Sequence, residues 1–334
     1  MNKQEHSILI IGGGSIGKRH LRNLLSLGEK KISLVEINKE RRKEIKIEFK
    51  ISVFQSIEDA FEKDNFNIAF ICSPSVFHLE QVLLCVEIGC DLFIEKPLSH
   101  NMDDVGGLVD LVKQKNLITM VGSNWKFYPL FKKMKELIDL NTIGKVLSAR
   151  CQCGQYLPDW HPWEDYRQGY SANKKMGGGI LLDSHEFDYL IWFLGDVKKL
   201  ACFAGNVSNL EIDTEDIAET ILQFKNGAIA EIHVDYLQRF RQRNFEFFGE
   251  LGTILWDTNE KRVVLLEKDK EKQGFLLDSG YDINDMYVEE VRHFLQCIEK
   301  REETVTPIER GAEVLNLICK AKESSTENKI ILIS

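Results

Sequence analysis

Two short motifs place chemically useful groups directly behind apolar runs. The first is Gly12–Gly17 (G-G-G-S-I-G), which follows the run Ile8–Ile11. The second is Glu95-Lys96-Pro97, which closes the run Asp91–Ile94. A glycine turn behind a strand is typical of dinucleotide binding, and open α/β sheets bind ligands outside the carboxyl ends of their strands. A lysine ammonium and a nicotinamide ring in one crevice would favour hydride transfer.

The spacing of the glycines fits a dinucleotide cradle. Gly12, Gly14 and Gly17 would supply the tight turn, the close approach of the backbone to pyrophosphate and the helix–strand contact. Ser15 and Ile16 would begin the helix whose free N–H groups point toward the phosphates. The motif therefore predicts a bound dinucleotide.

The choice between the two nicotinamide dinucleotides depends on Glu36. This residue ends the next expected strand, at about the spacing of twenty residues beyond the glycines that such acids show. A carboxylate there accepts hydrogen bonds from ribose hydroxyls and repels a 2′-phosphate, so NAD is favoured over NADP. Arg41 and Arg42 follow closely and keep NADP open.

The first 122 residues alternate short apolar runs with segments of helical spacing, which predicts a parallel sheet covered by helices on both faces. The expected strands are 8–11, 32–35, 68–72, 92–94 and 118–121, and the expected helices are 18–27, 58–62, 78–88 and 102–115. This part of the chain reads as an N-terminal Rossmann domain, residues 1–122.

After Gly122 the pattern changes to longer alternating stretches, which predict a large, mostly antiparallel open sheet with one face toward solvent or a partner. The expected strands are 146–153, 200–207, 219–224, 228–236, 243–249, 253–257 and 330–333, and the expected helices are 179–194, 286–300 and 308–324. Residues 123–334 thus form a second α/β domain, and the fold class is α/β throughout.

Composition excludes several classes of partner. The net charge of −9 argues against nucleic acid, because phosphate binding requires a basic face. No apolar run approaches the roughly 18 residues of a membrane helix, and no secretory signal is read. The eight cysteines form no C-x-x-C pair and lack histidines at zinc spacing, so we expect no metal, and free thiols in a reducing cytoplasm.

Further motifs extend these observations along most of the chain, and together they resemble the Gfo/Idh/MocA oxidoreductase family of glucose–fructose oxidoreductase and inositol 2-dehydrogenase. They are His20 behind the glycines, Ser73–His78 (S-P-S-V-F-H), Glu95–Leu98 (E-K-P-L), Gly122–Pro129 with Lys126 in place of the usual arginine, and Gly177–Asp188.

The resemblance implies an NAD(P)-dependent oxidoreductase acting on CH–OH groups. Its substrate would be a secondary hydroxyl, or the matching ketone, of a sugar, cyclitol or nucleotide-linked sugar. The second domain would bind this substrate and assemble the chain into a homodimer or homotetramer. The family pattern also implies a cis peptide bond between Lys96 and Pro97.

The resemblance also assigns roles to individual residues. The implied catalytic residues are Lys96, which would polarise the reacting oxygen, His185, which would move the proton, and Asp183. The implied cofactor contacts are Gly12, Gly14, Ser15, Ile16, Gly17, Glu36, Ser73, Pro74, His78, Glu95 and Lys96, and the implied substrate contacts are Lys96, Asn124, Tyr156, Trp163, Asp183 and His185.

The role of Asp183 stays open at this point. The family spaces its aspartate and histidine four residues apart, whereas Asp183 and His185 are two apart. On one regular helix these side chains would diverge by about 200°. Either a helix begins after Asp183, or Asp183 has another role; His185 and Asp188 could pair instead.

Two segments bear on the substrate. The stretch Tyr156–Arg167 is rich in aromatic and polar groups that suit a sugar, although it could equally be a packing loop. It also resembles that of relatives associated with surface-sugar biosynthesis. Arg239, Arg241 and Arg243 alternate along an expected strand, either as an anion site or, as we favour, as a solvated edge.

Two alternatives compete with the catalytic reading. A non-catalytic sensor of dinucleotides or sugars could keep the same fold after losing its chemistry. A reductase of a non-sugar substrate, of the dihydrodiol or tetrapyrrole type, is the second. Retention of both Lys96 and His185 speaks against the sensor.

Overall fold

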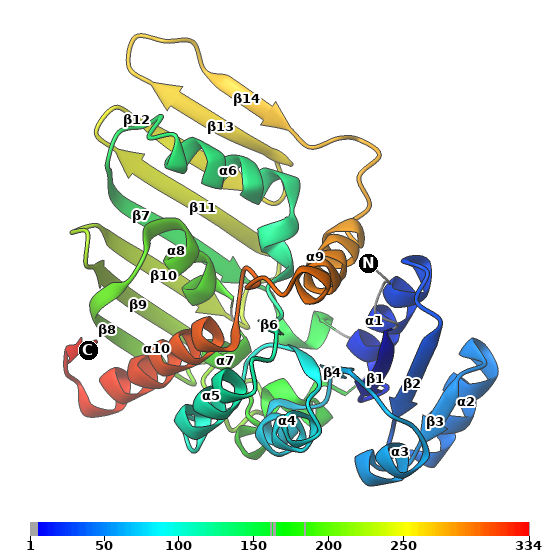
Figure 1. Cartoon of the computed structure of the whole chain (residues 1–334). Coiled ribbons are helices and arrows are strands. Elements are labelled where there is room, and N and C mark those ends of the chain that lie inside the picture. The colour runs from blue at the N-terminus through cyan, green and yellow to red at the C-terminus, as the bar shows by residue number, and fades with distance from the viewer. Residues whose placement is uncertain (1–5, 161, 163–164, 184, 334) are drawn as a thin grey trace. The chain divides into compact units, whose positions relative to one another are not determined.

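The computed structural model describes residues 6–160, 162, 165–183 and 185–333 of the chain. Packing divides the chain into two compact units, labelled by element in Figure 1. The first consists of residues 1–124 and 283–313, and the second of residues 125–282 and 314–334. The segment 283–313, which the sequence places in the second domain, thus belongs to the first unit. No described helix is long and apolar enough to cross a membrane.

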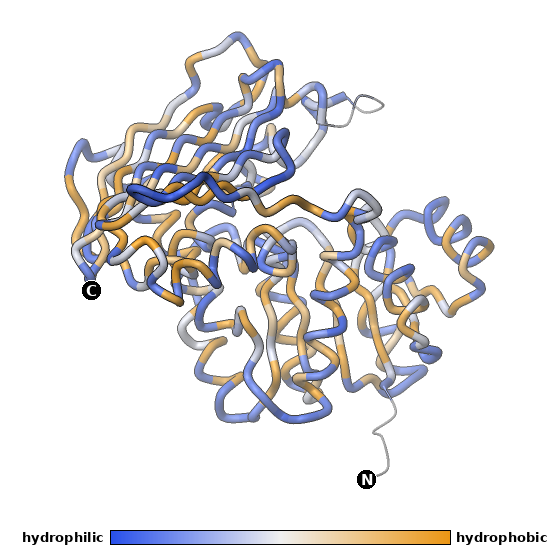
Figure 2. Tube along the Cα trace, turned by 90° about the horizontal axis from the view of Figure 1, so that it is seen from above, coloured by the Kyte–Doolittle hydropathy of each residue, from blue (hydrophilic) through white to orange (hydrophobic). Residues whose placement is uncertain are grey.

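The first unit contains a six-stranded parallel sheet in the order β3-β2-β1-β4-β5-β6. Its strands are β1 (Ser7–Ile11), β2 (Lys31–Val35), β3 (Ser52–Phe54), β4 (Ile68–Ile71), β5 (Asp91–Ile94) and β6 (Thr119–Val121). The central strands are buried along almost their whole length, because both faces of a parallel sheet are covered. The tube in Figure 2 is accordingly hydrophobic along these strands. The strand order reverses between β1 and β4, which is where Rossmann folds bind their dinucleotide.

The helices of the first unit are α1 (Ser15–Ser26), α2 (Lys39–Phe49), α3 (Ile57–Lys63), η1 (Ser75–Phe77), α4 (His78–Glu87), α5 (Val105–Gln114) and α9 (Asp285–Lys300). Helix α1 buries Gly17, His20, Leu21 and Leu24, which share one face at helical spacing. This face packs against β1, and α1 also contacts α9.

The second unit contains a nine-stranded mixed sheet in the order β14-β13-β12-β11-β7-β10-β9-β8-β15. Its strands are β7 (Val146–Gly154), β8 (Val197–Gly205), β9 (Ile217–Phe224), β10 (Ile229–Asp235), β11 (Gln242–Gly249), β12 (Gly252–Asp257), β13 (Arg262–Glu267), β14 (Gln273–Leu276) and β15 (Ile331–Leu332). All neighbouring strands are antiparallel except β7 and β10. The expected fold class is therefore confirmed.

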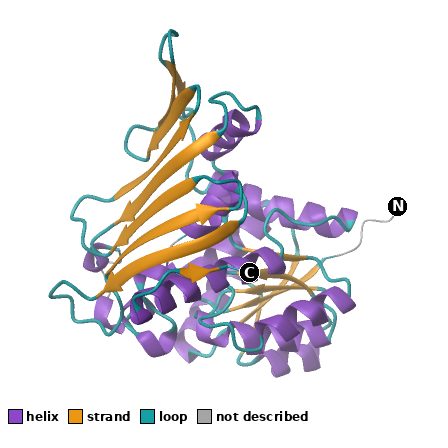
Figure 3. Ribbon diagram, turned by 90° about the vertical axis from the view of Figure 1, so that its left-hand side faces the viewer, coloured by secondary structure: helices purple, strands orange, loops and turns teal. Residues whose placement is uncertain are grey.

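Helices cover one face of this sheet, as Figure 3 shows. They are α6 (Pro129–Asp139), α7 (Ile180–Asp183) and α8 (Glu186–Leu194); α10 (Ile308–Glu327) begins in the first unit and ends in the second. Short 3₁₀ helices are η2 (Asn124–Phe127), η3 (Leu157–Asp159), η4 (Tyr166–Gln168), η5 (Tyr170–Ala172) and η6 (Lys174–Met176). Along β9 and β10, buried residues alternate with exposed ones, so the opposite face of the sheet is open.

Several elements differ from the expectations. The single helix over 179–194 is wrong: α7 ends at Asp183, and His185 is the N-cap of a separate helix α8. Helix α2 was not expected, because its highly charged sequence buries only Ile45 and so lacks an apolar stripe. The segments of β3, α6, β13 and β14 were also not predicted.

Candidate active site

The turn between β1 and α1 is shaped for close approach of a ligand. Gly12 has φ +105°, and a Cβ there would lie 2.7 Å from the carbonyl oxygen of Cys72. A Cβ on Gly17 would lie 2.0 Å from the carbonyl oxygen of Gly12. At Gly14, the N-cap of α1, an added Cβ would meet no protein atom within 4 Å. The backbone thus leaves open space at the helix N-terminus, which suits a dinucleotide pyrophosphate.

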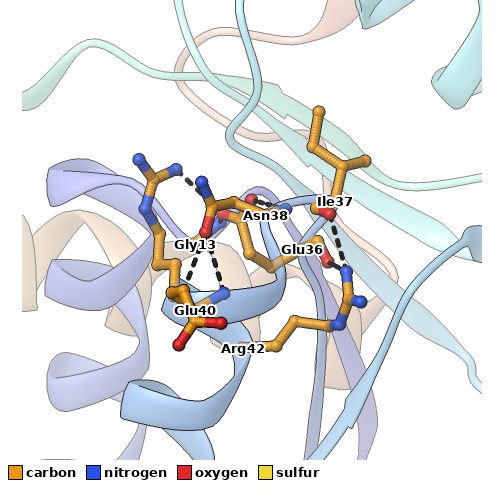
Figure 4. A network of polar contacts seen from close by, with 7 residues as sticks. Gly13, Glu36, Ile37, Asn38, Glu40 and Arg42 are labelled. Atoms are coloured by element: carbon orange, nitrogen blue, oxygen red, sulfur yellow. Dashed lines mark hydrogen bonds and ion pairs between the residues drawn. The ribbon is translucent and has the colours of Figure 1, made fainter.

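Glu36 is the first residue after β2 and lies beside this turn; Figure 4 shows its contacts. The carboxylate accepts hydrogen bonds from the backbone N–H groups of Gly13 at 3.0 Å and Asn38 at 2.8 Å. Only 4% of the side chain is exposed. The acid is thus fixed where the ribose-binding acid of a Rossmann fold belongs.

The two arginines after Glu36 differ in what they bind. Arg41 forms an ion pair with the Glu36 carboxylate at 3.1 Å and is 45% exposed. Arg42 donates to the backbone carbonyl oxygens of Glu36 and Ile37, each at 2.7 Å. Arg42 therefore stabilises the end of β2, whereas Arg41 pairs with the carboxylate of Glu36.

Lys96 lies two residues beyond the end of β5, at the carboxyl edge of the parallel sheet. Its neighbour Glu95 accepts a hydrogen bond from His20 Nε2 at 2.6 Å. The Lys96–Pro97 bond is cis, as the family resemblance implies. Open α/β sheets bind their ligands at this edge, so Lys96 is a candidate site residue.

The segment after β4 holds the remaining predicted cofactor contacts, Ser73, Pro74 and His78. Ser73 Oγ donates to Gln81 Oε1 at 2.6 Å. The His78 ring is buried, and its two nitrogens face the carbonyl oxygens of Ser73 at 2.8 Å and of Pro97 at 2.9 Å. Burial lowers the pKa of His78, although these carbonyls oppose that shift. His78 thus connects the loops after β4 and β5.

After β6, Ser123 and Asn124 are tied to α9. The Ser123 N–H donates to Glu290 Oε1 at 2.5 Å, and both residues are buried. Asn124 Nδ2 lies 3.6 Å from the Met286 sulfur. Glu290 was not predicted as a site residue. It lies among the apolar residues of the buried face of α9, and an acid at such a position indicates a buried polar partner.

In the second unit, Asp183 ends α7 and is buried. Its Oδ2 accepts a hydrogen bond from the Tyr236 hydroxyl at 2.5 Å. Burial raises the pKa of Tyr236 well above its ordinary value, and the Asp183 charge adds to this shift. Tyr236 is therefore a fixed hydrogen-bond donor to the Asp183 carboxylate.

His185 begins α8, and its ring lies parallel to the ring of Tyr189, with centroids 5.5 Å apart. Its backbone N–H donates to Glu186 Oε2 at 2.9 Å. Glu186 is fully buried and pairs with Arg243 at 2.8 Å. Helix α7 ends at Asp183 and α8 begins at Glu186, so Asp183 and His185 do not lie on one regular helix. The 200° divergence expected for one helix therefore does not apply.

A second buried ion pair lies on the same helix. Lys126 Nζ donates to Asp188 Oδ1 at 2.6 Å, and the lysine side chain is 1% exposed. Lys126 stands where the family usually has arginine, so the family position retains a cation. Asp188 therefore accepts a hydrogen bond from Lys126, and a pairing of Asp188 with His185 stays a prediction.

The aromatic segment after β7 is partly described. Tyr156 donates its N–H to the carbonyl oxygen of Gln238 at 2.7 Å, and the Arg239 guanidinium lies 3.5 Å from the centroid of its ring. Trp163 lies outside the described residues. The prediction that three arginines alternate along one strand is wrong. Arg239 and Arg241 precede β11, and only Arg243 lies in the strand, where it is buried.

The predicted site residues divide between the two units. The cofactor contacts, Lys96 and Asn124 belong to the first unit, and Tyr156, Asp183 and His185 belong to the second. Among the described residues, no group of three His, Cys, Asp or Glu side chains could hold a metal ion.

Two family models match this chain. The model of the oxidoreductase family with an NAD-binding Rossmann fold matches residues 6–123, and the GFO/IDH/MocA C-terminal domain matches residues 131–255. The chain belongs to the GFO/IDH/MocA oxidoreductase family. The predicted family, oxidoreductase class and NAD cofactor are thereby confirmed.

Individual GFO/IDH/MocA relatives match along most of their length. The chain is 28% identical over 342 residues to myo-inositol 2-dehydrogenase of Thermotoga maritima, covering 96% of this chain and 97% of that protein. It is 25% identical over 316 residues to levoglucosan dehydrogenase of Pseudarthrobacter phenanthrenivorans, covering 81% and 79%. A solved levoglucosan dehydrogenase in complex with NADH and levoglucosan superposes with a TM-score of 0.89 at 20% identity, over 99% of this chain and 100% of that chain.

Proposed function

We propose that this oxidoreductase moves hydride between NAD(H) and a secondary hydroxyl, or the matching ketone, of a sugar, cyclitol or nucleotide-linked sugar. The supporting observation is the position of Lys96, two residues beyond the end of β5, in the same parallel sheet whose β1 leads into the glycine turn. The named relatives act on inositol and levoglucosan, which are polyhydroxylated rings. A role in surface-sugar biosynthesis stays a prediction.

In this proposal Lys96 binds the reacting oxygen. Bound NAD supplies the hydride acceptor, and the chain supplies the groups that handle the hydroxyl. An ammonium donates hydrogen bonds and stabilises the negative charge that develops on the oxygen as its proton leaves. Lys96 therefore polarises this oxygen in either direction of the reaction.

His185 is the proposed general acid and base. An imidazole titrates near neutral pH and can both take and return the hydroxyl proton. Its ring lies parallel to Tyr189, and its backbone is anchored through the buried Glu186. Asp183, held by Tyr236, is proposed to contact the substrate, as are Asn124, Tyr156 and Trp163.

The direct test measures NADH absorbance with purified protein. A panel of sugars, cyclitols and nucleotide sugars is assayed with NAD and with NADP, and oxidised sugars are assayed with the reduced cofactors. Turnover of one substrate class supports the proposal and identifies the class. Tight NAD binding without turnover across the panel would favour the sensor or a non-sugar reductase.

The lysine is tested by substitution. Lys96→Ala removes the hydrogen-bond donor to the reacting oxygen, and we expect kcat to fall by about 10²–10⁴-fold. The dissociation constant of NADH, measured by fluorescence titration, should stay within a few-fold of wild type, because the glycine turn and Glu36 are unchanged. A variant that turns over at the full rate would contradict this mechanism.

We also propose that the open face of the nine-stranded sheet binds a second copy of the chain in a homodimer or homotetramer. This outer face, defined by Phe203, Glu219, Ile221, Ile229 and His233, combines exposed apolar and charged groups on neighbouring strands. Phe203 is 76% exposed, Ile221 47% and Ile229 48%. Such a patch is costly in water unless covered. A cytoplasmic location also stays a prediction.

A further inference from the structure

Glu95 precedes Lys96 in the chain, and a side chain of α1 holds its carboxylate. His20 Nε2 lies 2.6 Å from Glu95 Oε1, although the two residues are 75 positions apart. His20 is fully buried. The group adjacent to the proposed catalytic lysine is thus fixed by one hydrogen bond from a rigid element.

The surroundings of His20 restrict what it can do. Its ring contacts Phe70 and Phe93, with centroids 5.5 and 4.8 Å away. In the described part of the chain, Nδ1 has no hydrogen-bond partner. With Nε2 protonated, the ring satisfies its one polar contact, and the absence of a partner at Nδ1 leaves no onward route for a proton. His20 is therefore suited to holding Glu95 and unsuited to relaying protons.

The charges that face Glu95 come from several elements. Burial raises the pKa of the Glu95 carboxyl, but the hydrogen bond and charge of His20, together with Lys96 and His78, outweigh it, so the pKa lies below its ordinary value. The Cys72 thiol also faces this charge, and its pKa is raised by burial and by Glu95. Glu95 is consequently an anion at neutral pH.

The backbone of this loop has a separate anchor. His78 Nδ1 faces the Pro97 carbonyl oxygen at 2.9 Å, on the other side of Lys96 from Glu95. Gly122 gives the carboxylate room, because a Cβ there would lie 3.3 Å from Glu95 Oε2. Loss of the His20 contact therefore changes the orientation and the ionisation of the Glu95 carboxylate, while His78 still holds the backbone of the loop.

We propose that His20 is a positioning residue for Lys96, which it controls by holding the adjacent Glu95 carboxylate ionised and in one orientation. A fixed anion next to the ammonium determines where the Lys96 charge lies when the reacting oxygen binds. His20 touches neither substrate nor reacting atoms in this role. The inference rests on the proposed function of Lys96.

Two substitutions of His20 separate positioning from other roles. His20→Gln retains an N–H donor at the place of Nε2, whereas His20→Leu removes it. The Glu95 carboxyl is titrated by NMR in protein labelled with carbon-13 at the glutamate carboxyl, and Glu95→Gln assigns its resonance. We expect the pKa of Glu95 to rise in His20→Leu and to stay low in His20→Gln; an unchanged pKa in His20→Leu overturns the proposal.

The same variants predict a pH profile. Without its donor the buried Glu95 takes up a proton at higher pH, so the acid limb of kcat should move upward in His20→Leu, with kcat about tenfold lower below neutral pH. His20→Gln should keep the wild-type profile. If His20→Gln loses as much turnover as His20→Leu while Glu95 stays ionised, His20 moves protons and the proposal is wrong.

Two further variants keep the outcomes distinguishable. A fully active Lys96→Ala overturns the proposed function itself, whereas an inactive Lys96→Ala beside an unaffected His20→Leu overturns only the role of His20. Should His20→Leu fail to fold, Glu95→Gln retains the acceptor oxygen but removes the charge. We expect Glu95→Gln to lower kcat about tenfold, and we expect its pH profile to lack the fall of kcat at low pH that the wild type shows. Wild-type kinetics in Glu95→Gln would overturn the proposal.

Discussion

At the scale of single residues, we predict that Glu36 determines the choice between NAD and NADP. The acid accepts hydrogen bonds from the backbone N–H of Gly13 in the glycine turn, from the backbone N–H of Asn38 after β2, and from the side chain of Arg41. It therefore serves both as a structural acceptor and as a negative charge. These two roles can be separated experimentally.

Glu36→Gln retains an acceptor for the N–H groups of Gly13 and Asn38 but removes the charge that repels a 2′-phosphate. Arg41 is then free to bind that phosphate. We expect the ratio of NADPH to NADH affinity, measured by fluorescence titration, to rise about tenfold or more. Adding Arg41→Ala should remove this gain; if the ratio is unchanged in Glu36→Gln, the acid does not select the cofactor.

At the scale of elements, the start of α8 determines where His185 is presented. Two acids in the first turn of this helix, Glu186 and Asp188, are buried, and each is paired with a cation from another segment. Acids near a helix N-terminus are favourable because of the helix dipole. A buried charge without a counter-charge costs on the order of several kcal/mol, so these two ion pairs fix the position of the helix end.

Arg243→Met leaves the Glu186 carboxylate buried without its cation, and we expect unfolding in urea to lose about 3–5 kcal/mol of stability. Arg22→Met is the matched control, because the Arg22–Glu48 pair is about half exposed and its loss should cost about 1 kcal/mol or less. The double variant Arg243→Met with Glu186→Gln should recover part of the loss. Equal effects of Arg243→Met and Arg22→Met would contradict the importance of the buried pair.

At the scale of the whole molecule, the open face of the second sheet predicts self-association. Phe203→Glu places a charge in the outer face, and we expect it to shift the mass found by light scattering toward a monomer. Ile47→Glu is the control, because Ile47 is 77% exposed on α2 of the first unit and should leave the mass unchanged. A wild-type chain that is already monomeric would refute the prediction.

The sequence by itself determined the features that depend on local pattern. Apolar runs followed by glycines, by Glu36 and by Lys96 predict strand ends, and parallel strands bring such ends to one edge of the sheet. The family motifs then identified the class of enzyme. Helix α2 was not predicted, because a helix that buries a single residue shows no periodic pattern of apolar residues.

Only the tertiary structure decided which polar groups meet. His20 reaches Glu95 across 75 residues, Lys126 reaches Asp188 across 62, and Ser123 reaches Glu290 across 167. The end of α7 at Asp183 and the start of α8 at Glu186 were also not predicted, because apolar residues continue at helical spacing across both. In each case a buried charge or N–H group needs a partner to offset the cost of leaving water, and that partner is distant in the chain. The local periodicity of the sequence therefore does not identify it.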